Sequence, residues 1–83
     1  MVIAEYVRLF TEKVGSPPDI VGGRDGKILS DLLATRPLDD VLVLLRGFFH
    51  VGTRWNREVG RYDLAAFKAA FNDLLVMQSR GEL

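Results

Sequence analysis

The sequence predicts an all-α fold, a compact four-helix domain in which the third helix is central. Apolar residues recur at intervals of three and four along almost the whole chain. No segment shows the alternation of a half-buried strand, and glycine, proline or aspartate stands where each apolar run begins or ends. A chain of 83 residues is long enough for one compact core, so residues 1–83 are expected to form a single helical domain.

The first helix is expected over residues 2–14, because Gly15 and the prolines that follow it end the pattern. Its apolar face is formed by Ile3, Tyr6, Val7, Phe10 and Val14. In the loop that follows, Ile20 and Val21 are expected to pack beneath the chain and hold it in place. The second helix is expected to start between residues 24 and 27, with an apolar face formed by Ile28, Leu29, Leu32 and Leu33.

The third helix is expected from Leu38 to Phe49 and is apolar nearly all round, which is typical of a helix buried on most sides. Asp39 and Asp40 lie in its first turn, where carboxylates interact favourably with the helix dipole. The run VLVLL at 41–45 is also compatible with an isolated strand. The aspartate pair and the continuation of the apolar pattern to Phe49 favour the helix.

The fourth helix is expected to follow Asp63, which is a suitable N-cap residue, and to end at Ser79. Its buried face is predicted to hold Leu64, Phe67, Phe71, Leu74 and Leu75. Between the third and fourth helices, residues 50–61 (HVGTRWNREVGR) are expected to form an irregular basic loop.

Eleven basic residues balance eleven acidic ones, so the molecule as a whole has no electrostatic field that would attract nucleic acid or an anionic membrane. The absence of cysteine excludes disulfides and thiolate metal sites. No apolar run approaches the roughly 20 residues that span a bilayer. We therefore expect a cytoplasmic protein with no membrane partner.

The segment between the third and fourth helices is locally basic. From Arg46 to Tyr62, four arginines accompany a single carboxylate, Glu58. Arginines interleaved with aromatic residues are typical of surfaces that contact phosphates and stack on bases. The candidate nucleic-acid-binding residues are Arg46, His50, Arg54, Trp55, Arg57 and Arg61, with Arg24 and Lys27 as secondary phosphate contacts. The alternative is that the aromatic residues anchor the core and the arginines are merely solvated.

Three known functional motifs do not fit the sequence: a phosphate-binding loop, a helix-turn-helix and a catalytic group around a histidine. Gly22 to Lys27 has three residues between its outer glycines where a phosphate-binding loop has four, and Ile28 stands where that loop needs Ser or Thr. The third helix offers mainly Val, Leu and Phe, so it is unsuited to reading base edges in a helix-turn-helix. His50 is the only histidine, and no spacing implies a catalytic group around it. We therefore predict no catalytic residue, no metal site, no cofactor and no enzymatic activity.

Four short motifs occur in order along nearly the whole chain: EKVG at 12–15, GRDGKIL at 23–29, LLRGFF at 44–49, and GRYDL at 60–64 followed by Phe67. In this order they resemble a helical module of phage and prophage DNA-replication proteins, in the replisome-organiser and helicase-loader group. The resemblance implies a setting in phage-type DNA replication and supplies no active site.

These observations predict a small accessory module of phage or mobile-element DNA replication, which binds DNA through the basic loop, a replication protein, or both. The alternative is a protein-interaction module without affinity for nucleic acid, either a homodimer or a factor that binds a host protein.

Overall fold

The computed structural model describes residues 2–20 and 22–83. The all-α prediction is confirmed, since the described residues form helices and no strand. The helices are α1 (Val2–Val14), α2 (Gly22–Thr35), α3 (Leu38–His50), α4 (Arg54–Val59) and α5 (Leu64–Ser79). The predicted number of four helices is therefore wrong for the described residues, because α4 forms inside the segment expected to be an irregular loop.

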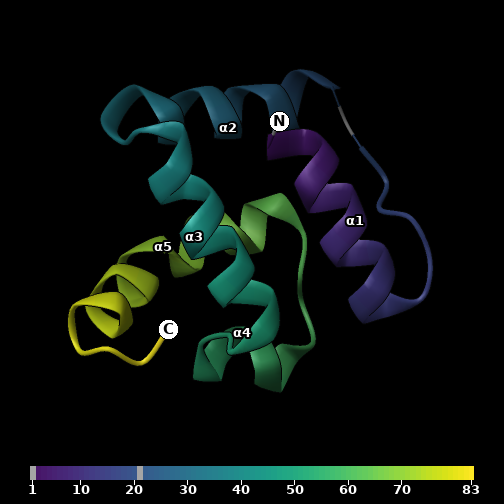
Figure 1. The fold of residues 1–83 in the computed structure, drawn as a ribbon. Helices are drawn as coiled ribbons and strands as arrows, with labels where there is room; N and C mark the ends of the chain where they lie inside the picture. Colours follow the sequence, from purple (N-terminus) through teal and green to yellow (C-terminus); the bar gives the residue numbers. More distant parts are fainter. Residues whose placement is uncertain (1, 21) are drawn as a thin grey trace.

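The helices are arranged around α3. It runs through the middle of the molecule with α1 on one side and α5 on the other, while α2 crosses its N-terminal end and α4 lies at its C-terminal end (Figure 1). α3 contacts α1, α2 and α5, and α5 also contacts α2 and α4. The two ends of α3 are thus covered by different helices, and α4 is remote from α2.

Two local predictions are corrected. α2 begins at Gly22 rather than between residues 24 and 27. The two glycines of its first turn are poor helix formers, and Asp25 in the same turn offsets part of that cost through its interaction with the helix dipole. Ile20 is 39% exposed and does not pack beneath the preceding loop. Val21, its predicted companion, lies outside the described residues.

The buried faces agree with the predicted ones most closely in α5, where Leu64, Phe67, Phe71 and Leu74 are buried and Leu75 is half-buried. In α1 the buried residues are Val2, Tyr6 and Leu9, whereas Val14, predicted to face the core, is 49% exposed. The buried residues of α3 are Val41, Leu44, Leu45, Phe48 and Phe49. One side of α3 stays open, since Val43 is 45% exposed.

Seven of the eight aromatic side chains form one continuous set of ring contacts in the described structure. Phe48 and Phe49 are at its centre, with ring centroids 5.4 Å apart. Phe48 contacts Phe67 of α5, and Phe49 contacts Tyr6 of α1. The remaining members are Phe10, Tyr62 and Phe71. This aromatic cluster joins α1, α3 and α5, and burial within it raises the pKa of Tyr6 to about 12.

The chain after α5 folds back onto α3. Gly81 has a left-handed backbone (φ 72°), and the amides of Gly81 and Glu82 donate to the carbonyls of Gln78 and Met77. This is the hydrogen-bond pattern of a Schellman motif. It brings Leu83 against Gly47, where an added Cβ would lie 2.9 Å from Leu83 Cδ2. The glycine in the last turn of α3 therefore makes room for the leucine side chain.

The aromatic cluster gives a direct test of the core. Replacing Phe48 with Ala removes a fully buried ring and its contacts with Phe49, Tyr62 and Phe67. We expect this change to lower the free energy of unfolding by about 3–5 kcal/mol. Chemical denaturation followed by circular dichroism measures this effect. Val43→Ala, on the exposed side of the same helix, is the matched control and should cost less than about 1 kcal/mol.

Candidate nucleic-acid interface

α4 is short, and its ends are fixed by side-chain and backbone hydrogen bonds. The Thr53 hydroxyl accepts a hydrogen bond from the Asn56 amide at 3.3 Å, and Asn56 Oδ1 accepts one from the Thr53 amide at 2.6 Å. This reciprocal pair is a capping box. At the other end, Gly60 takes the left-handed conformation (φ 69°) and ends the helix.

Asn56 is fully buried and also ties down the segment after α4. Its Nδ2 donates to the Arg61 carbonyl at 3.4 Å, and its own carbonyl accepts from the Arg61 amide at 3.1 Å. The predicted site did not include Thr53 or Asn56. The signal that could have found them is the Thr-x-x-Asn spacing, which departs from the usual capping box by having Asn in place of Glu or Gln.

Trp55 lies on the surface of α4 and is 41% exposed. It is the one aromatic residue outside the aromatic cluster, so the expectation that aromatic residues anchor the core holds for Phe48, Phe49 and Tyr62 but not for Trp55. The guanidinium of Arg61 lies over the indole, 5.8 Å from its centroid. Asp63 accepts two hydrogen bonds from Arg61, at 3.2 and 3.0 Å, and these raise the pKa of Arg61.

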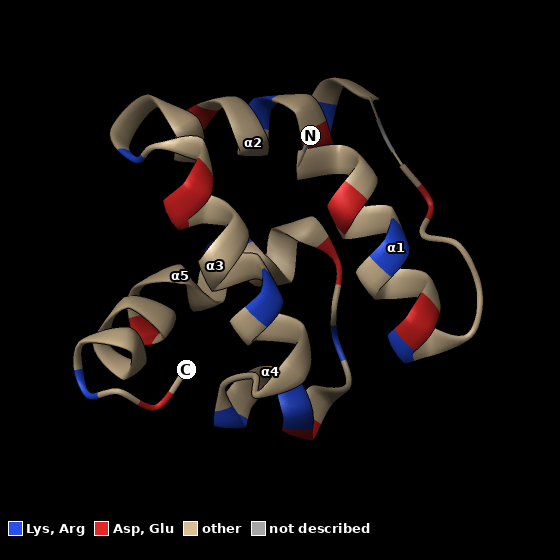
Figure 2. Cartoon of the chain, in the orientation of Figure 1, with Lys and Arg blue, Asp and Glu red and all other residues tan. Residues whose placement is uncertain are grey.

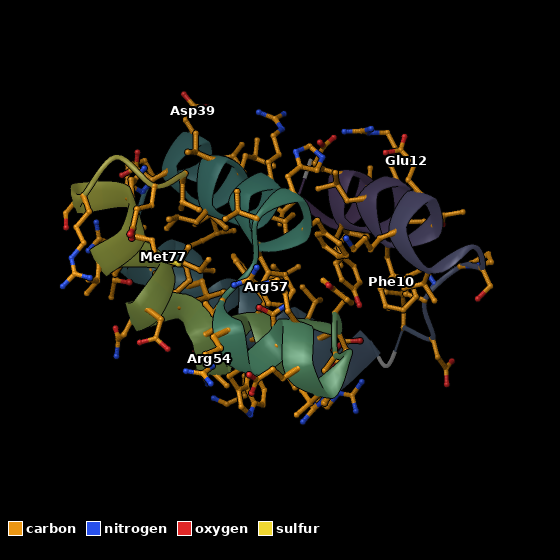
Figure 3. All side chains as sticks on the ribbon, turned by 90° about the horizontal axis from the view of Figure 1, so that it is seen from below. Phe10, Glu12, Asp39, Arg54, Arg57 and Met77 are labelled. Carbon is orange, nitrogen blue, oxygen red and sulfur yellow. The ribbon has the colours of Figure 1, made fainter. Side chains whose placement is uncertain are left out.

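Arg54 and Arg57 lie one turn apart on α4, and their surroundings differ. Arg54 forms an ion pair with Glu58 at 2.9 Å, and both side chains are exposed to solvent. Arg57 forms no ion pair with any described residue, and its Nε donates to the Thr53 carbonyl at 3.3 Å. Its side chain passes close to Gly52. In Figure 3, Arg54 lies at the margin of the molecule and Arg57 lies nearer its middle.

Arg46 belongs to a different surface. It pairs with Glu5 of α1 at 3.1 Å, and Arg8 pairs with the same carboxylate at 2.6 Å. Hydrogen bonds from Arg8 and then from Arg46 hold the pKa of Glu5 down at about 2. Arg46 therefore links α3 to α1, which is a structural role that the predicted DNA contact did not include.

The other predicted residues are distributed over the molecule. Arg24 and Lys27 belong to α2, at the opposite end of α3 from α4 (Figure 1), and pair with Asp25 at 3.3 Å and Asp31 at 3.9 Å. Figure 2 shows the same separation, with basic positions both on α2 and around α4. Of the predicted set, the structure brings together the α4 residues and Arg61, and it does not bring the α2 pair to them.

His50 is exposed and lines two open pockets. One, of about 420 Å³, lies between α1 and α3 and is also lined by Leu9, Glu12, Lys13 and Phe49. His50 and Glu12 share this pocket without a hydrogen bond between them.

Among the described residues, no group of three His, Cys, Asp or Glu side chains is placed to hold a metal ion. None of the helices described is both long and apolar enough to cross a membrane.

Comparison with known proteins gives no further assignment, because no family model, curated protein sequence or solved structure matches the chain. The geometry of the described residues and the motif resemblance are therefore the basis for a functional proposal.

Asn56 allows a test of how α4 is held. Asn56→Ala removes the acceptor of the Thr53 amide and the donor to the Arg61 carbonyl, so both groups are left without that partner. We expect a decrease of about 1–3 kcal/mol in the free energy of unfolding. We also expect a shift in the emission of Trp55, the only tryptophan. Glu58→Ala, an exposed change on the same helix, is the control; equal effects of the two changes would contradict a special role for Asn56.

The Glu5 ion pairs predict a pH dependence. The folded-state pKa of about 2 lies below the ordinary value of 4.5, so the ionised carboxylate stabilises the folded state above pH 4.5. That contribution is lost as the pH falls from 4.5 towards 2. Glu5→Gln should therefore destabilise the protein at neutral pH, and its difference from the wild type should shrink in acid.

Urea denaturation of both proteins at neutral pH and in acid measures this difference. Glu12→Gln is the control, since Glu12 reaches only Arg8 in an exposed pair. A difference between wild type and Glu5→Gln that stays constant across the acid range would contradict the assignment.

Proposed function

We propose that the chain is a small nucleic-acid-binding module that makes its contact through α4 and the nearby Arg61. The observation that supports this most directly is the exposed indole of Trp55, with arginines on the same short helix and the Arg61 guanidinium over its ring. Aromatic surface combined with arginine is the combination that contacts bases and phosphates together.

The ion pairs on this surface are compatible with binding. Arg54 and Glu58 form an exposed pair, and exposed pairs contribute about 0–1 kcal/mol. A phosphate therefore replaces Glu58 at small cost. Arg57 forms no ion pair with a described residue, so no such pair has to break when a phosphate binds to it. With three arginines against Glu58 and Asp63, the net charge of residues 53–63 is 3 − 2 = +1. The affinity then rests on close contacts rather than on a strong long-range field.

The biological setting that we propose is phage-type DNA replication, as the four motifs suggest. In that setting the chain acts as an accessory module that binds DNA, a replication protein, or both. The α2 residues Arg24 and Lys27 are left out of the proposed surface, because they lie at the other end of the molecule (Figure 1).

Removing the two arginines of α4 tests the proposed function. Arg54→Ala combined with Arg57→Ala should weaken binding to labelled DNA oligonucleotides, because each arginine neutralises a phosphate. The slope of log affinity against log salt should become shallower by about 0.7–0.9 for each phosphate that is no longer neutralised. Fluorescence anisotropy titrations at several salt concentrations measure both quantities.

Lys27→Ala combined with Lys68→Ala is the matched control, since it also removes two positive charges, both of which pair with Asp31 of the remote α2. It should leave the affinity close to that of the wild type. If the α4 double variant keeps both the affinity and the salt slope of the wild type, α4 is not the binding surface.

The second candidate function is protein interaction. It is favoured by the open side of α3, where Val43, Val51 and Leu83 are exposed beside a pocket of about 230 Å³. Exposed apolar patches on small proteins often mark contact surfaces. A dimer detected by light scattering, together with no DNA binding at low salt, would favour this function over the first.

A further inference from the structure

We propose that α4 binds a single strand of DNA in preference to a duplex, with one base stacked on the indole of Trp55. This inference rests on the proposed function and specifies its ligand. It starts from the contrast between Trp55, which is 41% exposed, and the other seven aromatic residues, which make up the aromatic cluster.

The backbone that carries Trp55 is held in place before any ligand arrives. The capping box fixes the first turn of α4, and Gly60 ends the helix. Arg61 lies over the ring at 5.8 Å, and Arg61 donates two hydrogen bonds to Asp63. Arg61 and Asp63 form an exposed ion pair, so the guanidinium can move aside for a base that stacks on Trp55 at small cost.

The strand preference follows from the geometry of the ligand. In a duplex, both faces of every base are covered by neighbouring base pairs, so an indole can reach a face only after the step has been unstacked. In a single strand the faces are accessible, and stacking on an aromatic side chain tolerates any base. Duplex recognition would instead need several polar side chains free to reach base edges. Of the four polar residues of α4, Asn56 is buried in the capping box, Arg54 and Arg57 are assigned to phosphates in the proposed site, and only Glu58 is left.

Arg54 and Arg57 complete the proposed site. They lie one turn apart, at positions that are neighbours on a helix surface, and Trp55 follows Arg54 directly. Phosphates of the bound strand would contact these two arginines while a base stacks on the indole. Arg54, next to Trp55, is the phosphate contact nearest the stacked base, whereas Arg57 lies about 160° round the helix from Trp55 and contacts a phosphate further along the strand.

The test compares an oligothymidine single strand with a duplex of the same length, using the full chain. We expect binding of the single strand to be at least about tenfold tighter and to change the emission of Trp55. Trp55→Ala should weaken single-strand binding by roughly 5- to 150-fold, which is the value of one base–aromatic stack. It should change duplex binding little. Trp55→Phe keeps an aromatic face and should retain most of the affinity.

The outcomes separate this inference from the function on which it rests. Equal affinity for both ligands, or single-strand binding that Trp55→Ala leaves unchanged, overturns the stacking site but keeps a DNA-binding α4. No binding of either ligand at low salt overturns both. Because Trp55 is exposed, its replacement is expected to leave the fold intact, and circular dichroism of each variant checks this.

Discussion

The packing of two adjacent phenylalanines on α3 is the constraint on which the other helices depend. Neighbouring residues on a helix point about 100° apart, so Phe48 and Phe49 face different parts of the molecule. Phe48 contacts Phe67 of α5, and Phe49 contacts Tyr6 of α1. Both contact Tyr62, whose ring is stacked on that of Phe49 with an interplanar angle of 20°. One dipeptide therefore fixes the positions of α1, of α5 and of the segment between α4 and α5.

This constraint also explains the position of α4. Phe49 and Tyr62 both belong to the aromatic cluster, so residues 50–61 must connect two points that lie close together. A short helix capped by Thr53 and Asn56 gives backbone amides of this segment, among them those of Thr53, Asn56, Arg57 and Arg61, hydrogen-bond partners within the segment itself. Trp55 lies on this short helix, is 41% exposed and makes no contact with the aromatic cluster in the described structure. The candidate site is thus a consequence of how the core is assembled.

The sequence predicted the long helices well because their signals are local. Apolar residues at helical spacing and the stop at Gly15 define α1, and the same spacing after Asp63 defines α5. α4 was missed because six residues are too few to show a periodicity, and its start depends on the side chain of Asn56. Asp63 was correctly expected at the N-cap position, but its carboxylate pairs with Arg61 instead of capping the helix.

The candidate site was harder to predict than the fold. Arg46 was grouped with the arginines of α4 because it is near them in the sequence. Its partner, Glu5, is 41 positions away, and only the packing of α1 on α3 brings the two together. The exposure of Trp55 is also a tertiary property, since an aromatic residue in a connecting segment is compatible with burial and with exposure alike.

The close approach of Leu83 to Gly47 has a consequence for how related chains vary. Any side chain at position 47 would occupy the volume that Leu83 fills, so the two positions compete for the same space on α3. Relatives that carry alanine or a larger residue at the first position should carry a small or displaced residue at the second. Because Leu83 is itself 36% exposed and meets Gly47 with the end of a flexible side chain, an alanine at position 47 displaces that side chain and leaves the core of α3 intact.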